Sequence, residues 1–159
     1  MGERAENLAA DFEKATAEFA KEIESMPDDK WQKALGPEGW TVAATAQHVA
    51  GQFPLEGEYI FAAAEGKPMP TYSWDDINHK NDARAAQNTD ATKAEVLDLL
   101  RTDAAKMADY VRNLSDEQLD RQVPLALADN AMVTTQQLIE GGVLIDHVRG
   151  HLESIRSAN

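Results

Sequence analysis

The sequence predicts an all-α protein, a four-helix bundle with short extra helices. Apolar residues recur at steps of three and four over several long stretches, which places them on one face of a helix. Most of these stretches begin at a Ser or Thr, and Glu or Gln often follows three residues later, a typical helix start. No convincing period-two strand pattern, internal repeat or composition shift interrupts the 159 residues. We therefore expect a single helical-bundle domain spanning residues 1–159.

The first helix follows from an apolar stripe near the N-terminus and should end before Pro27, which cannot continue a helix. The connection that follows includes the turn-forming stretch "GPEGW". A second helix should begin after Thr41, kink at Pro54 and stop at Gly66. The stripe of the first helix comprises Leu8, Phe12, Ala15, Phe19, Ile23 and Met26.

Three further helix starts lie in the middle of the chain. Ser73 can cap a helix through "WDDINHKNDARAA", and Thr92 with Glu95 forms a capping-box pattern before the clearest apolar seam of the chain. Ser115 with Gln118 predicts a short helix in the same way. The seam, which suits packing between antiparallel neighbours, consists of Leu97, Leu100, Ala104, Met107, Val111 and Leu114.

The C-terminal third begins with an apolar segment, "RQVPLALADNAMV", which we expect to be a loop with extended backbone around Leu125 and Leu127. Thr134 with Gln137 should then cap a final helix that continues almost to the C-terminus.

Charge argues against several classes of partner. The chain has 28 acidic and 15 basic residues, a formal charge of −13, and no run of Lys or Arg. Such a surface repels a phosphate backbone or an anionic membrane, so we expect neither nucleic acid nor membrane as a partner. With no apolar signal core or membrane span, we expect a cytoplasmic protein. The absence of cysteine removes disulfides, thiolate ligands and any cysteine nucleophile of the chain itself.

Histidines supply the candidate site. His147 and His151 are four residues apart, so on a helix their rings lie on one side, about 6 Å apart, and can share a metal. The pair is not the metalloprotease motif, because Val148 stands where that motif has its glutamate. His48 lies two turns into the second helix and would approach the pair if the second and last helices are neighbours. The alternative is that all three are polar residues at the boundary of the core.

Motifs in both of these helices resemble a known family. "GWTVAATAQHVA" resembles the second-helix signature of the DinB/YfiT-like superfamily of metalloenzymes, and "LIDHVRGHLESI" is similar to the HxxxH segment of that family's last helix. The middle of the chain, from "WDDINHKND" to "LSDEQLDR", also resembles the family's third and fourth regions. The resemblance covers nearly the whole chain.

This resemblance implies an up-down-down-up bundle, a homodimer, and a divalent metal held by His48, His147 and His151. Relatives include mycothiol-dependent maleylpyruvate isomerase and bacillithiol or mycothiol S-transferases. The implied function is a metal-dependent enzyme for a small-molecule substrate, a thiol S-transferase or isomerase. The metal is left open among zinc, nickel and iron, and a low-molecular-weight thiol would be a co-substrate.

Catalytic residues cannot be assigned from the sequence. Several polar residues near the histidines could orient an imidazole, although each is more simply an exposed residue: Asp146, Glu140, Gln47, Gln52 and Glu56. Asn78 and Asn81 could likewise turn toward a pocket, whereas we expect His79 to be exposed. We expect the aromatic residues to pack against neighbouring helices or to line a pocket: Trp40, Tyr72 and Trp74.

Two other functions fit the same residues. A metal-bound hydroxide would support hydrolysis in place of thiol transfer. A noncatalytic bundle dimer could instead bind a metal or an apolar ligand, and a member with boundary histidines would bind no metal at all.

Overall fold

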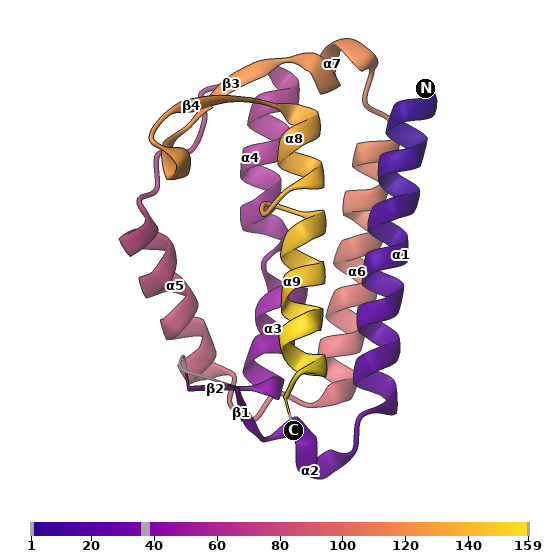
Figure 1. Cartoon of the computed structure of the whole chain (residues 1–159), viewed down its shortest axis with the longest axis vertical. Coiled ribbons are helices and arrows are strands. Elements are labelled where there is room, and N and C mark those ends of the chain that lie inside the picture. The colour runs from indigo at the N-terminus through magenta and orange to yellow at the C-terminus, as the bar shows by residue number, and fades with distance from the viewer. Residues whose placement is uncertain (1, 36–38, 159) are drawn as a thin grey trace.

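Four helical columns run along the long axis of the molecule in the computed structural model, which describes residues 2–35 and 39–158 (Figure 1). The first and last columns run in one direction and the middle two in the other, so the expected up-down-down-up bundle is confirmed. In chain order the columns are α1 (Glu3–Ser25), α3 (Val42–Gly51) with α4 (Phe53–Glu65), α6 (Lys93–Arg112), and α8 (Thr135–Glu140) with α9 (Ile145–Arg156).

The first column ends where the sequence predicts. The backbone leaves the helix at Met26, and Pro27 then caps a short helix, α2 (Asp28–Trp31). Strands β1 (Ala34–Leu35) and β2 (Trp40–Thr41) pair antiparallel and lead into the second column. Most of the expected "GPEGW" connection lies outside the described residues.

The second column is interrupted where Pro54 predicts a kink. Helix α3 ends at Gly51, and α4 begins at Phe53 with Pro54 in its first turn, where a missing backbone N–H costs nothing. The Thr41 side chain accepts a hydrogen bond from the backbone N–H of Ala44, as expected of an N-cap. Gly66 ends α4 with φ of 68°, a left-handed conformation that favours glycine.

All four predicted helix starts from Ser73 onward form complete capping boxes. The first opens α5 (Trp74–Gln87), which lies outside the four columns and returns the chain from the end of α4 to the start of α6 (Figure 1). Another opens α7 (Asp116–Asp120), a short helix before the last column.

Two expectations are wrong for the C-terminal third. The segment expected to be a loop forms a hairpin, in which β3 (Gln122–Leu125) pairs with β4 (Ala131–Thr134) around a short 3-10 turn, η1 (Ala126–Ala128). Asp129 and Asn130 close the turn at φ of 53° and 61°, which these residue types tolerate better than most. Strands of four residues are too short to show the two-residue alternation of apolar and polar side chains by which a strand is predicted from sequence.

The final helix is also not continuous, contrary to expectation. Its backbone hydrogen-bond ladder is interrupted after Glu140, and the backbone N–H groups of Leu144 and Asp146 both donate to the carbonyl of Gly141 where α9 begins. The last column therefore consists of two helices, joined by residues 141–144.

The core lies between the columns, with α1 packed on α6 and α9, and α3 packed on the same two helices. Phe12 and Phe53 meet edge to face with ring centroids 5.5 Å apart at its centre. The apolar stripe of α9 that faces this core, Ile145, Val148, Leu152 and Ile155, is buried. Among the described residues, no helix combines the length and the apolar character needed to cross a membrane.

Candidate functional site

Three imidazole rings converge between α3 and α9. His48 comes from α3, while His147 and His151 come from successive turns of α9, and the two helices are neighbours. Nε2 of His147 lies 3.0 Å from Nε2 of His48 and 3.2 Å from Nε2 of His151. All three candidate ligand atoms lie within 4.8 Å of one another. Residues separated by 99 positions therefore form one cluster.

The spacing of the nitrogens suits a shared cation. Metal–nitrogen bonds of about 2.0–2.1 Å, at octahedral to tetrahedral angles, place neighbouring ligand nitrogens about 2.8–3.4 Å apart. Both contacts of His147 Nε2 fall within this range. Without a cation, the Nε2 of His147 would have to satisfy two imidazole nitrogens with one lone pair or one proton. The donor set thus fits a metal better than it fits hydrogen bonding alone.

Burial keeps the cluster in the protonation state that a ligand needs. Burial, together with the neighbouring histidines and Arg84, lowers the pKa of His48 to about 2, and burial is the largest of these causes. Burial alone lowers the pKa of His147 to about 4. The Trp40 ring covers His48 edge to face, with centroids 5.3 Å apart. Both imidazoles are therefore neutral at pH 7, with a lone pair available for a metal.

Glu56 stands behind His147 on the side away from the other rings. Its Oε1 lies 2.7 Å from Nδ1 of His147, although the two atoms are not aligned as a hydrogen bond. The side chain is buried at 5% exposure, and this burial raises the pKa of its carboxyl well above the usual value. A carboxylate on the second nitrogen of an imidazole is the common arrangement that orients a metal ligand.

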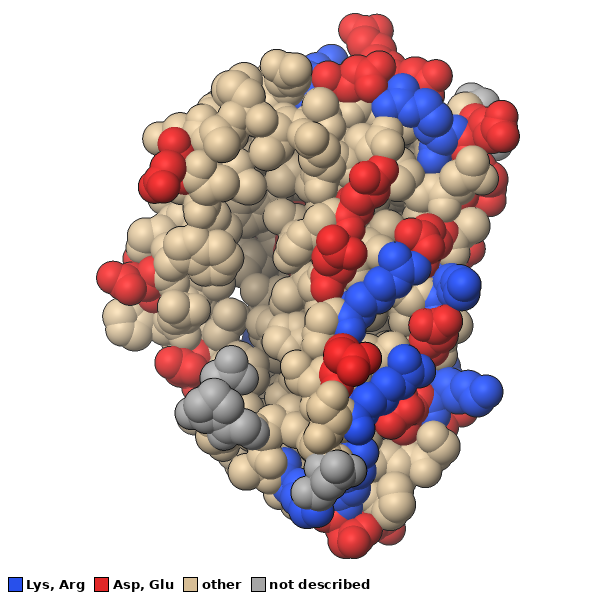
Figure 2. Space-filling model, viewed as in Figure 1, with Lys and Arg blue, Asp and Glu red and all other residues tan. Residues whose placement is uncertain are grey.

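A pocket of about 140 Å³ opens beside the cluster. Its walls come from α3, α4, α5, the hairpin turn and the break between α8 and α9. Figure 2 shows the viewed face hollowed between α5 and α9, bordered by uncharged residues. The lining residues are His48, Gln52, Leu55, Glu56, Tyr59, Trp74, Ile77, Asn81, Leu127, Gly142, Val143 and His147.

The polar residues suggested from the sequence divide into two groups. Gln52, Glu56, Asn81 and the aromatic Trp74 line the pocket. The others do not line it: Gln47 is half-buried, with a buried, unpartnered Oε1, while the rest are exposed, namely Asn78, His79, Glu140 and Asp146. Tyr72 instead holds Lys80 over its ring at 4.7 Å.

Sequence reasoning missed part of the pocket wall. Leu127 belongs to the turn of the unforeseen hairpin, and Gly142 and Val143 belong to the unforeseen break before α9. The adjacent glycines at 141 and 142, inside an otherwise helical pattern, were the one signal that could have indicated the break.

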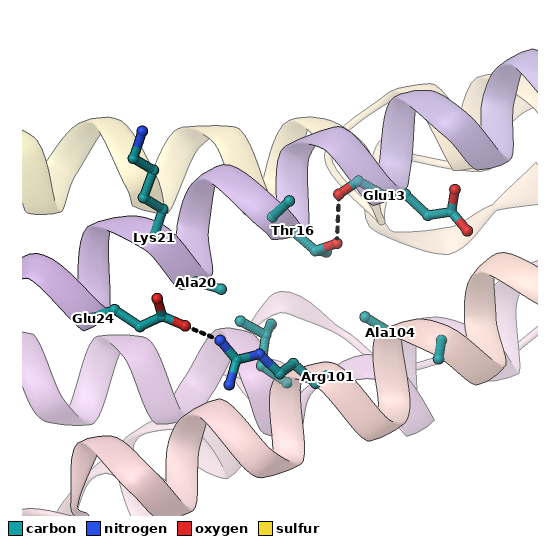
Figure 3. A pocket seen from close by; sticks show the side chains of 10 residues that line it. Glu13, Thr16, Ala20, Lys21, Glu24, Arg101 and Ala104 are labelled. Atoms are coloured by element: carbon teal, nitrogen blue, oxygen red, sulfur yellow. Dashed lines mark hydrogen bonds and ion pairs between the residues drawn. The ribbon is translucent and has the colours of Figure 1, made fainter.

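A larger groove of about 360 Å³ lies elsewhere, between α1 and α6 (Figure 3). Small side chains such as Ala20 and Ala104 form its floor, and Arg101 pairs with Glu24 across it. Among the described residues that line it there is no histidine and no buried polar side-chain atom without a partner. The histidine pocket is therefore the candidate site despite its smaller volume.

Comparison with known proteins identifies the family of the chain. The family model of the DinB superfamily matches residues 11–155, which include all three histidines. No match was found among curated proteins.

Solved structures share the fold. YfiT from Bacillus subtilis, described as a probable metal-dependent hydrolase with an unusual four-helix bundle topology, has 16% identity and a TM-score of 0.74 over 99% of this chain and 87% of its own. A mutant of the mycothiol-dependent maleylpyruvate isomerase has 15% identity and a TM-score of 0.73 over 98% of this chain, which spans 61% of that protein. The colibactin self-resistance protein ClbS, solved with double-stranded DNA, has 14% identity and a TM-score of 0.73 over 97% of this chain and 94% of its own. At these identities the likeness shows the fold alone.

Proposed function

We propose that this chain, which belongs to the DinB superfamily, is a metal-dependent enzyme that transfers a small thiol to an electrophilic small molecule or isomerises it. The observation that carries the proposal is the convergence of three imidazoles beside a pocket. A mycothiol-dependent isomerase and a protein described as a probable metal-dependent hydrolase, both of the same fold, support it.

Each histidine has a definable part in holding the metal. His48, His147 and His151 would each bind it through Nε2, the atom that each directs at the others. Glu56 would accept a hydrogen bond from Nδ1 of His147, which fixes the ring and leaves Nε2 for the metal. Trp40 holds the His48 ring from the other side. These supports preorganise the ligands before the metal arrives.

Three neutral imidazoles would leave a divalent cation its full charge, and that charge would let a bound thiol or water lose its proton to solvent near neutral pH. The chain has no cysteine, so the thiol would be a co-substrate. In the transfer, the thiolate sulfur forms a bond to the electrophilic carbon, and the leaving group departs with the electrons of the bond that breaks. The pocket walls would hold that carbon near the cluster and exclude bulk water.

Hydrolysis is the second candidate, because the same cation would activate water and one protein of this fold is described as a probable metal-dependent hydrolase. Nucleic acid is disfavoured as a partner by the charge of −13. On the viewed face, Lys and Arg lie among Asp and Glu without forming a separate patch (Figure 2). Arg112 and Arg149, for example, are paired with Glu13 and Asp11.

Metal content separates these functions from a noncatalytic bundle. The protein is purified without nickel resin, and its metal is compared with that of a His147→Ala variant. We expect about one divalent ion per chain in the parent protein and a large loss in the variant. Equal and negligible metal in both would contradict the proposal.

Cobalt substitution then tests the thiol. A thiolate bound to cobalt adds a strong charge-transfer band in the near ultraviolet, so we expect this band when a small thiol is added. If every small thiol leaves the cobalt spectrum unchanged while metal remains bound, the thiol transfer is wrong and hydrolysis becomes the candidate.

A further inference from the structure

The pocket beside the histidines limits the charge of the molecule that can occupy it. Among its described lining residues there is no Lys or Arg, and the only acidic group is Glu56. Whether Glu56 is neutral or ionised, it offers no positive charge to an anion. A carboxylate buried here without a cation would lose its hydration without compensation.

The Lys and Arg side chains of the adjoining pocket already interact with other groups of the protein. Lys80 and Arg84 line an adjoining pocket that shares Gln52, Leu55 and Asn81 with the first. Arg84 donates a hydrogen bond to the backbone carbonyl of Gly51, and Lys80 lies over the Tyr72 ring. Glu58 lies on the same lining and offsets one of the two charges. Neither cation lines the inner pocket, although Arg84 is near enough to His48 to lower its pKa.

Size and wall chemistry indicate what does fit. A cavity of roughly 150 Å³ with apolar walls holds one benzene molecule, and this pocket has about 140 Å³. Its apolar wall consists of Leu55, Trp74, Ile77, Leu127 and Val143. The Trp74 indole donates a hydrogen bond of 2.8 Å to the carbonyl of Leu127, which ties α5 to the hairpin turn and fixes this wall.

One hydroxyl on the wall has no hydrogen-bond partner, in addition to the unpartnered atoms of Glu56, His48 and His147. The hydroxyl of Tyr59 is buried without a hydrogen bond, although the residue lines the pocket at 3% exposure. An unsatisfied buried hydroxyl costs free energy that a ligand with a hydrogen-bonding oxygen would recover.

We propose that this pocket takes an uncharged small molecule with a compact, ring-sized apolar body and one hydrogen-bonding oxygen, and that its protein walls, without a metal, exclude carboxylate-bearing molecules of the same size. The assignment of this molecule as the electrophilic substrate rests on the proposed function. Any negative charge in the site would then be that of the thiolate, with the metal as its counter-ion.

A matched pair of probes tests the inference: benzyl alcohol and benzoate share a ring and differ in charge. Binding is followed by the indole resonances in ¹H–¹⁵N NMR spectra of the full chain after chelator treatment, with the Trp74 signal assigned by Trp74→Phe. Because metal is absent, benzoate cannot bind through it. We expect benzyl alcohol to shift the Trp74 signal saturably and benzoate to bind at least about 10-fold more weakly.

Two glycine variants locate the binding. A Cβ atom added at Gly142 meets no atom within 4 Å, and Gly142 lines the pocket, so we expect the side chain of Gly142→Leu to take up pocket volume without a clash at its Cβ. Gly150 has the same open surroundings outside the pocket, which makes Gly150→Leu the control. We expect Gly142→Leu to weaken benzyl alcohol binding at least about 10-fold, since the added side chain would occupy volume that the ring needs, and Gly150→Leu to leave binding unchanged.

Equal or tighter binding of benzoate would overturn the charge restriction. Absence of saturable benzyl alcohol binding, or equal binding by Gly142→Leu, would overturn the pocket. A zinc titration of the same samples tests the proposed function separately: failure to bind zinc with intact benzyl alcohol binding would remove the metal centre and leave the pocket.

Discussion

Replacing Glu56 by glutamine should move stability and metal affinity in opposite directions. The carboxyl is buried and its pKa is raised, so the folded protein binds its proton more tightly than the unfolded chain does. The free energy of unfolding therefore falls as the pH rises above the usual value of 4.5, by about 1.4 kcal/mol for each unit of the elevation. Glu56→Gln keeps the size and removes this cost, so the metal-free variant should be more stable at pH 7.

Metal affinity should instead decrease. Oε1 of Glu56 is 2.7 Å from Nδ1 of His147, close enough to accept a hydrogen bond from its N–H when Nε2 binds a cation. Loss of such an outer partner typically weakens metal binding about 10- to 100-fold, or about 1.4–2.7 kcal/mol. A glutamine oxygen can still accept the hydrogen bond but carries no charge, so the lower half of this range is expected.

Urea denaturation of the metal-free proteins at pH 5 and pH 7 measures the first effect, and competition with a chromogenic chelator for zinc measures the second. Glu58→Gln is the matched control, because Glu58 lies on the same helix and is exposed. The reasoning is refuted if Glu56→Gln destabilises the metal-free protein at pH 7. It is equally refuted if zinc affinity changes no more than in Glu58→Gln.

Three further outcomes follow from the same structure. Burial, the largest cause, holds the pKa of His48 near 2, so below pH 6.5 the unfolded chain binds a proton at this residue and the folded chain does not. The free energy of unfolding of the metal-free protein should therefore fall by about 1.4 kcal/mol per pH unit relative to His48→Gln, as measured by urea denaturation from pH 7 to 4.5. Phe12→Ala should cost about 3–5 kcal/mol of unfolding free energy, because the fully buried ring packs edge to face on Phe53; a loss below 1 kcal/mol would contradict the core described here. Thr92→Ala should cost about 1 kcal/mol by removing the reciprocal bonds with Glu95 at the start of α6, and an unchanged urea midpoint would argue against the cap.

Local sequence signals predicted most of the fold because the physics they report is local. A capping box needs only residues three positions apart, and all four boxes from Ser73 to Thr134 form. Pro54 likewise acts on its own turn. The hairpin escaped prediction because its eight strand residues show no usable period and its pairing is set by the turn at Asp129 and Asn130. The break at Gly141 escaped because the apolar pattern continues across it.

In the candidate site, too, the sequence predicts the features that depend on local spacing and misses those that depend on tertiary packing. The spacing of His147 and His151 places them together on any helix, so the sequence alone predicts that pair. The approach of His48 depends on α3 and α9 packing side by side, which spacing within one segment cannot report. Glu56 was one of several equal choices until the fold placed its carboxyl against His147. The apolar wall around Leu127 could not be predicted, because it depends on the hairpin, which the sequence did not indicate.

X-ray absorption at the zinc edge tests the three-histidine centre most directly. With one equivalent of zinc, the account predicts three imidazole nitrogens at about 2.0–2.1 Å, seen by their multiple scattering, and a loss of one imidazole in folded His48→Ala. Zinc surrounded by oxygen ligands, with a signal that His48→Ala leaves unchanged, would mean that the acidic surface and not the histidine cluster binds the metal.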